Sequence, residues 1–364
     1  MEKMKVAVLV SGGVDSSVAL QLLKNQGYDV TAFYLKIWLE DELSYLGDCP
    51  WQEDLAFVQA VCEQIEVPLE IISLQKEYQE KIVAYTIAEV KAGRTPNPDI
   101  LCNQYIKFGL FLEKIDARFD KVASGHYAQV RENNGIIELY ESPDLIKDQT
   151  YFLSHLSQEQ LQKIMFPIGH LTKTELRNLA QEFNLSNKDR RDSQGICFLG
   201  KFKFSDFIKH HLGTQQGSLI EYETGKIMGS HEGFWFYTIG QRQGIRLAGG
   251  PWYVVAKDSS TNSVYISRNY FDSAKQRNTF TIENIHWIAN QEPFKKDLWV
   301  KLRHGSQKYK CTVHYNLDKT LVKIAEQDQG IASGQFAVFY DNGICLGSGI
   351  ISQSFLENNI CEKN

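Results

Sequence analysis

The residues best placed to do chemistry near the start of the chain are small and hydroxyl side chains at positions 11–17, Ser-Gly-Gly-Val-Asp-Ser-Ser. They follow an apolar, β-branched run at 5–10 and precede an apolar, helix-forming run at 18–23. Gly12 and Gly13 let backbone N–H groups approach a ligand closely. Serines at the start of a helix lie where free N–H donors favour an anion. The pattern therefore predicts a phosphate-binding loop at the carboxyl end of the first strand of an α/β sheet.

This loop differs from the two most familiar nucleotide motifs. It has no lysine, which the Walker A pattern requires, and it does not match G-x-G-x-x-G. The heptapeptide instead resembles the pyrophosphate-binding loop of ATP pyrophosphatases, which bind ATP and release pyrophosphate when they adenylate an oxygen. An ordinary strand–turn–helix is the alternative for a bare Ser-Gly-Gly, whereas the full heptapeptide favours the nucleotide site.

Two cysteines far apart in the sequence lie next to turn-forming residues. Cys102 follows a Pro-rich segment near the start of an expected helix, where the helix dipole lowers a thiol pKa. Cys197 lies in a glycine-flanked segment that is typical of a loop. The two thiols could converge on one site, although an isolated cysteine is more often a small buried apolar residue. Asp99 and His126 likewise allow two interpretations: each is either a site residue or a surface or capping residue.

The composition is that of a globular chain with sizeable cores. The 364 residues are 43% hydrophobic and 23% charged, which suggests two or three domains. No apolar run is long enough to span a membrane, and the first apolar run is a strand rather than a signal peptide. Seven cysteines without a Cys-x-x-Cys pair argue against a secreted disulfide scaffold and a zinc ribbon. We therefore expect a reducing compartment, with the cytoplasm as the prediction.

Charge is unevenly distributed along the chain. The net charge is −5, but the residues from 201 onward carry +4, so the first 200 carry −9. The run 299–310 contains Lys301, Arg303, Lys308 and Lys310 and no acid. Such a run suits phosphate contacts, while a solvated strand face is the alternative. The aromatic segment 233–237 likewise allows two interpretations: its side chains either stack on bases or pack in the core.

The hydrophobic pattern changes at about residue 204. Before it, strand-like runs at 29–35, 69–74 and 121–125 alternate with helical patterns, which predicts a doubly wound parallel sheet. After it, short period-two runs with frequent glycine predict a β-rich half. We expect three domains: an ATP-binding α/β domain at 1–204 with a helical part at 156–190, a small β-rich domain at 205–277, and a β-barrel at 278–358.

Six further segments complete a pattern that resembles the tRNA-specific 2-thiouridylase family. They are residues 93–103 (with Arg-Thr-Pro-Asn-Pro-Asp and Leu-Cys-Asn), 125–128 (Gly-His-Tyr-Ala), 147–153, 192–198 (Asp-Ser-Gln-Gly-Ile-Cys-Phe), 237–242 and 334–340. They occur in the family's order and cover essentially the whole chain. The family installs sulfur at C2 of the wobble uridine, U34, in the tRNAs for Lys, Glu and Gln.

The resemblance implies a role for particular residues. The positions that surround ATP in the family correspond in this sequence to Leu9, Val10, Ser11, Gly12, Gly13, Val14, Asp15, Ser16, Leu35 and Gly125. Contact with the target base matches Asn97, Pro98 and Asp99, and contact with the rest of the tRNA matches His126, Lys147, Asp148, Gln149, Arg303, His304 and Gln335. Cys102 is implied as nucleophile or resolving thiol and Cys197 as carrier of a persulfide. Arg303 and His304 match the family's pattern imperfectly, and Cys49 and Cys62 match no role.

The implied chemistry uses ATP with Mg²⁺ near Asp15 to adenylate the C2 oxygen of the extruded uracil. Sulfur then arrives from the persulfide, directly or as sulfide, and a Cys102–Cys197 disulfide remains for a reductant to reopen. A cysteine desulfurase or a relay protein would supply the sulfur, and no resident metal site is implied. Asp99 is either an acid or base or a positioning residue. We expect residues 94–103 to be unordered without tRNA.

Two alternatives use the same loop. One is a different adenylating ligase or amidotransferase, which needs no cysteine pair. The other is a non-catalytic tRNA-binding protein that keeps a nucleotide-binding fold.

Overall fold

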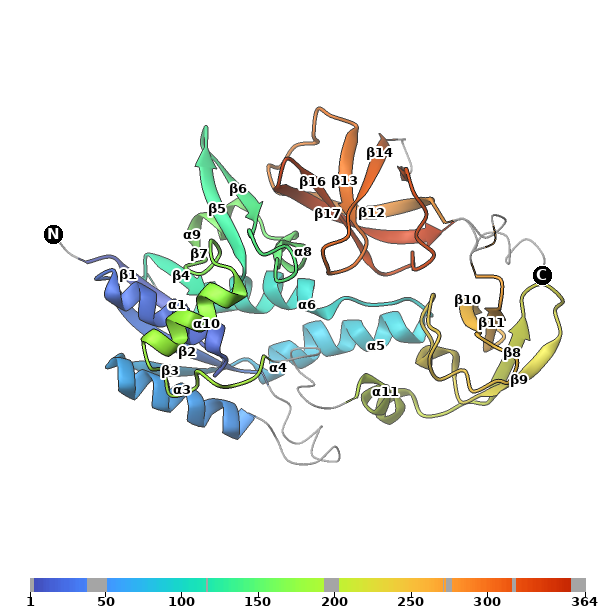
Figure 1. The fold of residues 1–364 in the computed structure, drawn as a ribbon, viewed down its shortest axis with the longest axis horizontal. Helices are drawn as coiled ribbons and strands as arrows, with labels where there is room; N and C mark the ends of the chain where they lie inside the picture. Colours follow the sequence, from blue (N-terminus) through green and yellow to red (C-terminus); the bar gives the residue numbers. More distant parts are fainter. Residues whose placement is uncertain are drawn as a thin grey trace.

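The fold is that of a computed structural model, which describes residues 3–37, 51–115, 117–192, 203–270, 272, 277–315 and 319–354. Cys49 and Cys197 lie outside these residues. Figure 1 shows a parallel sheet with its helices at one end of the molecule, a small sheet at the other end, and a β-barrel above them in that view.

The first part of the chain forms a five-stranded parallel sheet in the order β3-β2-β1-β4-β7. Its strands are β1 (Lys5–Leu9), β2 (Asp29–Lys36), β3 (Leu69–Ser73), β4 (Lys121–Ser124) and β7 (Ile164–Met165). Chain order reverses at β1, so the switch point of the sheet lies between β1 and β4. Open α/β sheets bind ligands at this point, beyond the carboxyl ends of the strands. The predicted doubly wound sheet is confirmed.

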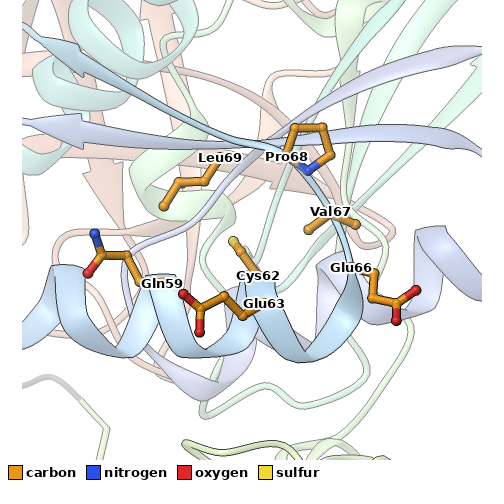
Figure 2. Close-up of a pocket in the computed structure, with 7 residues that line it drawn as sticks. All are labelled: Gln59, Cys62, Glu63, Glu66, Val67, Pro68 and Leu69. Atoms are coloured by element: carbon orange, nitrogen blue, oxygen red, sulfur yellow. The ribbon is translucent and has the colours of Figure 1, made fainter.

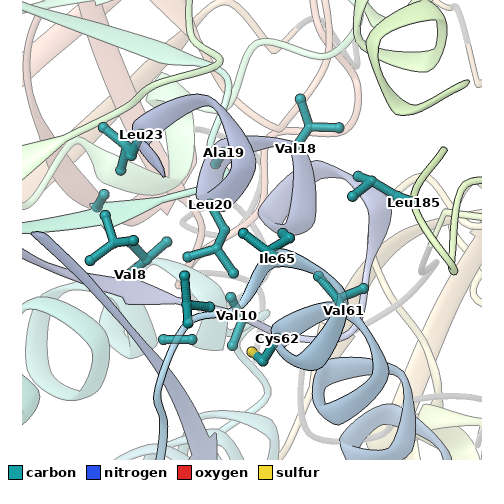
Figure 3. Packing of buried hydrophobic residues seen from close by; sticks show 14 of the residues in the cluster. Val8, Val10, Val18, Ala19, Leu20, Leu23, Val61, Cys62, Ile65 and Leu185 are labelled. Carbon is teal, nitrogen blue, oxygen red and sulfur yellow. The ribbon is translucent and has the colours of Figure 1, made fainter. Parts of the chain in front are cut away.

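Helices cover both faces of this sheet. On one face lie α1 (Val14–Asn25), α3 (Trp51–Ile65) and α10 (Lys173–Glu182), and Figure 3 shows Leu20 and Ile65 from these helices in the same core as Val8 and Val10. The remaining helices of this part are α4 (Gln75–Tyr78), π-helical η2 (Gln79–Val83), α5 (Ala84–Lys91), α6 (Pro98–Leu101), π-helical η3 (Cys102–Leu110), α7 (Phe111–Lys114), α8 (Thr150–Leu153) and α9 (Gln158–Lys163). The stretch 156–190 is therefore not wholly helical, because β7 separates α9 from α10 and completes the sheet.

A helix and a small sheet follow. Helix α11 (Phe204–Leu212) leads into a four-stranded sheet in the order β10-β11-β8-β9. The strands are β8 (Gly217–Glu221), β9 (Ile227–His231), β10 (Tyr253–Asp258) and β11 (Ser263–Ser267), with the short 3₁₀ helix η4 (Phe234–Phe236) between β9 and β10. Phe234 is buried in the core of this sheet, so at this position the packing interpretation of the aromatic segment is confirmed.

The last strands close into a six-stranded barrel. The strands are β12 (Thr279–Trp287), β13 (Asp297–Lys301), β14 (Tyr309–Tyr315), β15 (Thr320–Ile324), β16 (Phe336–Asp341) and β17 (Ile344–Ser354), and pairing of β12 with β17 completes the ring. The barrel is not separate from the first part. The hairpin β5 (Ala128–Asn133) and β6 (Ile136–Glu141) adds to β17, with Ile344 opposite Tyr140 and Cys345 opposite Leu139.

Buried polar groups also join the barrel to the first part. Lys301 of β13 is 1% exposed, and its Nζ lies 2.8 Å from Asp148 Oδ2 and 3.2 Å from Glu141 Oε1. Ser348 of β17 lies 2.6 Å from Nδ1 of the buried His155. These contacts fix the barrel on the α/β part.

The pH dependence of stability should report the burial of His155. Burial and the neighbouring His286 lower the pKa of His155 to about 3, below its unfolded value of about 6.5. Between these two pH values the unfolded state binds more protons than the folded state. The contribution of His155 to stability is therefore fully present above about pH 6.5 and is lost as the pH falls toward 3. Urea unfolding at a series of pH values should show a shallower acid loss for His155→Gln than for the wild type. His170→Gln, a change at an exposed histidine, should keep the wild-type slope.

Candidate functional site

The loop at residues 11–17 leaves the start of α1 open to an anion. Gly13 is the N-cap of α1, and no side chain caps the helix. The hydroxyls of Ser16 and Ser17 donate to the carbonyl oxygen of Gly13 at 3.0 and 3.1 Å, which closes the loop on itself. The first backbone N–H groups of α1 therefore remain free to donate hydrogen bonds to a phosphate.

Close packing holds this loop in place. A Cβ on Gly125, which follows β4, would lie 2.7 Å from the backbone nitrogen of Ser16, so only glycine fits there. Gly12 has a φ of +77°, and a Cβ on it would meet the backbone oxygen of Asp54 at 2.6 Å. The buried Asn187 donates from Nδ2 to the carbonyl oxygen of Gly12 and to the hydroxyl of Ser17, each at 2.9 Å. Asn187 is a positioning residue that the sequence did not indicate.

The apolar members of the predicted ATP site lie at the same edge of the sheet. Leu9 and Val10, at the end of β1, are buried, and Val14 is buried in the first turn of α1. Leu35 at the end of β2 is half-buried and packs against the cluster that contains Cys102. The structure therefore brings these predicted residues to the carboxyl ends of β1 and β2.

An ion network borders the loop. We define it as Asp15, Lys147, Lys173, Arg177 and Asp192. Lys173 Nζ lies 2.6 Å from Asp15 Oδ1 and 2.8 Å from Asp192 Oδ1, and Lys147 and Arg177 lie 2.7 and 2.5 Å from the Asp192 carboxylate. Burial alone would raise the pKa of Asp192, but hydrogen bonds and charges from Lys147 and Lys173 lower it well below its usual value. Lys173 and Arg177 were not predicted, because no local motif marks them.

The Pro-rich segment lies against the barrel. The backbone N–H of Thr95 donates to Ser333 at 2.8 Å, and the buried Tyr151 donates from its hydroxyl to Phe336 at 3.1 Å. Asn97 caps α6 by accepting from the N–H of Ile100 at 3.4 Å. Residues 94–103 therefore lie in defined contact with the barrel here, and their lack of order without tRNA stays a prediction.

Barrel residues predicted to contact tRNA lie beside this segment. The carboxylate of Asp99 acts electrostatically on His304, and the charge of Arg303 acts on Tyr151. The imidazole of His304 stacks on Phe152 with ring centroids 4.7 Å apart. Arg303 is half-exposed and paired with Asp328 at 2.7 Å. Although Arg303, His304 and Gln335 are over 200 residues from Asn97, the fold brings them to the segment that holds Asn97, Pro98 and Asp99.

The four remaining predicted tRNA contacts differ in exposure. His126 is half-buried between Phe108 and Phe166, and burial lowers its pKa well below the usual value. Gln149 accepts from the N–H of Tyr127 at 3.0 Å. Lys147 belongs to the ion network described above. Asp148 is 1% exposed and bonded to Lys301 and to the hydroxyl of Thr150, so its carboxylate cannot reach tRNA from this position.

The thiol of Cys102 is less acidic than predicted. Its thiol is fully buried with Tyr78, Ile82 and Phe207, and burial raises its pKa to about 11. The helix begins at Pro98, so Cys102 lies beyond the first turn, where the helix dipole no longer acts strongly. The predicted activation of Cys102 by the dipole is wrong, and the structure contains a thiol that must be uncovered before it reacts.

A hollow elsewhere in the α/β part does not fit the predicted chemistry. It measures about 460 Å³ and lies between the end of α3 and the start of β3, as Figure 2 shows. Glu63 and Glu66 line it, so it disfavours an anion. Cys62 also lines it, but the thiol is 3% exposed and burial raises its pKa to about 11. Cys62, unassigned from sequence, is a core residue of the α/β part.

The described part of the chain contains neither a cluster of metal-ligating side chains nor a membrane-spanning helix. No group of three or more His, Cys, Asp or Glu side chains there has the arrangement of a metal site. Every helix within the same ranges is too short or too polar to cross a bilayer.

Comparison with known proteins covers nearly the whole chain. Three family profiles match in order: "tRNA methyl transferase HUP domain" at residues 4–201, "tRNA methyl transferase PRC-barrel domain" at 205–268, and "Aminomethyltransferase beta-barrel domain" at 277–351. A protein of Parabacteroides distasonis named "tRNA-specific 2-thiouridylase MnmA" is 45% identical over 96% of this chain and 99% of its own length. Proteins of Bacteroides thetaiotaomicron and Streptococcus thermophilus with the same kind of name are 44% and 42% identical over 96% and 99% of this chain, and over 100% and 98% of their own lengths.

Proposed function

The chain belongs to the tRNA-specific 2-thiouridylase family, and from this premise we propose that it thiolates C2 of the wobble uridine U34 in the tRNAs for Lys, Glu and Gln. ATP is the activating co-substrate. The observation that carries this proposal is the common position of the open α1 terminus and Cys102 at one edge of the sheet. Leu35, the residue before the last of β2, packs on the cluster that contains Cys102.

The first step activates a poor leaving group. The C2 oxygen of uracil attacks the α-phosphorus of ATP, and pyrophosphate departs. The open N–H groups of α1 stabilise the charge on the phosphates. Mg²⁺ in nucleotide sites is held mainly by phosphates and one or two carboxylates, and Asp15 supplies a carboxylate beside the loop. The ion would add charge neutralisation, and the described residues offer no larger ligand cluster.

The second step replaces oxygen by sulfur. In one route the terminal sulfur of a persulfide on Cys197 attacks C2, AMP leaves, and Cys102 then attacks the Cys197 sulfur to free the thiouridine. In the other route Cys102 first releases sulfide from the persulfide, and the sulfide attacks C2. Both routes leave a Cys102–Cys197 disulfide, which a two-electron reductant must reopen. A cysteine desulfurase or a relay protein would reload the sulfur.

Recognition of the tRNA would use the junction between the α/β part and the barrel. Asn97, Pro98 and Asp99 would meet the extruded base, since bases in an anticodon loop are the easiest to splay out. Asp99 would position the base or act as an acid or base. His126, Lys147, Gln149, Arg303, His304 and Gln335 would contact the surrounding nucleotides. Asp148 would act through Lys301 and its own backbone instead, because its side chain is enclosed.

The domain division and the location of the protein complete this proposal. We place the ATP-binding part at residues 1–204, the small β-rich part at 205–277 and the tRNA-contacting barrel at 278–358. The cytoplasm is the proposed location.

The proposal is tested by nucleoside mass spectrometry of tRNA after incubation with ATP, Mg²⁺ and a persulfide donor. The wild type should replace one oxygen of uridine by sulfur, which differs in mass from the methyl addition that the profile descriptions name. Cys197→Ala should abolish 2-thiouridine while tRNA binding in a filter assay stays within about twofold of the wild type. Thiolated product from Cys197→Ala would contradict the proposal.

Two other measurements separate the alternatives. An adenylating ligase would keep full activity with an amine substrate after both Cys102 and Cys197 are replaced. A non-catalytic RNA-binding protein would show no tRNA-stimulated release of pyrophosphate from ATP.

A further inference from the structure

The 11–17 loop lacks the lysine with which Walker A loops neutralise phosphate charge. Free backbone N–H groups supply only partial positive charge, about half an elementary charge for a whole helix terminus. A triphosphate carries several negative charges, so a full cation near this loop would favour its binding. Such a cation needs a fixed position beside the loop and partners that it can exchange for phosphate oxygens.

Lys173 meets both conditions. It is the first residue of α10, whose start is fixed by a capping box between Thr172 and Glu175. Its backbone N–H donates to Asp144 Oδ2 at 3.0 Å, and α10 packs against α1 through Leu176. The side chain is 17% exposed and extends to Asp15 in the first turn of α1, where Nζ lies 2.6 Å from Oδ1.

The partners of Lys173 can be exchanged at small cost. The side chain of Asp15 is 31% exposed, so water can replace part of the interaction that its carboxylate makes with Lys173. If Lys173 leaves, Asp192 keeps Lys147 and Arg177, while Asp15 keeps the hydroxyl of Tyr127 at 3.3 Å. Arg190 also lies beside the loop, but it is ion-paired with Asp54 and lies over the ring of Phe57 at 4.5 Å.

We propose that Lys173 binds the β- and γ-phosphates of ATP and so replaces, from α10, the lysine that the loop lacks. In the free protein Asp15 and Asp192 hold the ammonium group beside the loop. When ATP binds, Lys173 exchanges Asp15 for phosphate oxygens, and the Asp15 carboxylate becomes available to the Mg²⁺ that accompanies the nucleotide. This inference rests on the proposed use of ATP and adds a specific ligand to it.

The test compares nucleotides that differ only in phosphate number. Titration calorimetry of the full chain with ATP and with AMP, each with Mg²⁺, should show Lys173→Met weakening ATP binding by about tenfold to a hundredfold, the usual effect of losing a hydrogen bond to a charged group. Binding of AMP should change by less than about twofold, because the residue contacts only the outer phosphates. Lys173→Arg, which keeps the charge, should recover part of the ATP affinity.

Lys24→Met is the matched control, since Lys24 lies at the other end of α1 and donates to the backbone of Glu66. It should bind both nucleotides as the wild type does. Unchanged ATP affinity in Lys173→Met would overturn the inference, and so would an equal loss of ATP and AMP, which would indicate a disturbed loop. Failure of the wild type to bind ATP would instead count against the proposed function, so the two failures are distinguishable.

Discussion

A Cys102→Ala variant is expected to bind ATP and tRNA but to form no 2-thiouridine. The proposed sulfur transfer needs the Cys102 thiol in either route, to free the thiouridine from Cys197 or to release sulfide from the persulfide. The thiol is fully buried, and burial raises its pKa to about 11, so it is not nucleophilic in the free protein. We therefore expect activity to fall to background, a loss of at least about a thousandfold, typical of removing a nucleophile.

The measurement is the amount of 2-thiouridine formed per enzyme, with tRNA binding determined in parallel. Cys62→Ala is the matched control, because Cys62 is also buried and burial likewise raises its pKa to about 11, but it packs in the core beside α1 and α3. Both variants remove one buried sulfur and should lose comparable stability, about 1–2 kcal/mol. Near wild-type thiolation by Cys102→Ala would exclude Cys102 from the reaction.

Because Cys102 is buried, its thiol must be uncovered before it can react. The thiol lies in a buried cluster that also contains Tyr78, Ile82 and Phe207. Exposure to water would remove the burial that raises the pKa of this thiol, and a nearby cation or a hydrogen bond to the thiolate would lower it further. Residues 94–103, which include Cys102, contact the barrel through the hydrogen bond from the N–H of Thr95 to Ser333. Binding of tRNA at that junction is therefore the natural event to uncover the thiol.

Replacement of Lys301 by methionine is expected to lower the free energy of unfolding by about 3–5 kcal/mol. The lysine is 1% exposed, and its removal leaves the Asp148 carboxylate buried without its cation. Glu141 keeps Lys308, so the loss falls mainly on Asp148. Urea unfolding at neutral pH checks this value. Because Lys301 joins the barrel to the α/β part, tRNA binding should also weaken at temperatures below the unfolding transition.

Lys308→Met is the control for this prediction. Lys308 also pairs with Glu141, at 2.7 Å, but its side chain is 23% exposed and water replaces part of the lost interaction. Its loss should reduce stability by about 0–1 kcal/mol. Equal losses in the free energy of unfolding for the two substitutions would show that burial does not determine how much Lys301 contributes to stability.

Local sequence determined the elements of the α/β part. The β-branched run before residue 11, the glycines at 12 and 13, and the helix-forming run after residue 17 are sufficient for a strand, a phosphate-binding turn and a helix, because each preference acts within a few residues. The same local logic predicted the β-rich second half. It missed β7, since a strand of two residues has too little periodicity to be recognised.

Other properties depended on contacts between distant residues. The family resemblance implies a tRNA contact for Asp148, but the barrel contributes Lys301 and encloses the pair. A cysteine after a Pro-rich turn suggests an acidic thiol, but packing against Phe207, more than a hundred residues away, raises its pKa. Burial and charge pairing arise only when these segments meet, and no local pattern records them.

The 11–17 loop illustrates both kinds of information. By itself the sequence indicated a strand, two glycines and a helix that opens with Ser16 and Ser17, which together predict an anion site. Only the tertiary structure decided that Lys173, more than 150 residues later, would lie beside Asp15. The physical reason is range: backbone conformation is fixed by neighbouring residues, whereas the electrostatic field at a site is summed over every charge that the fold brings near it.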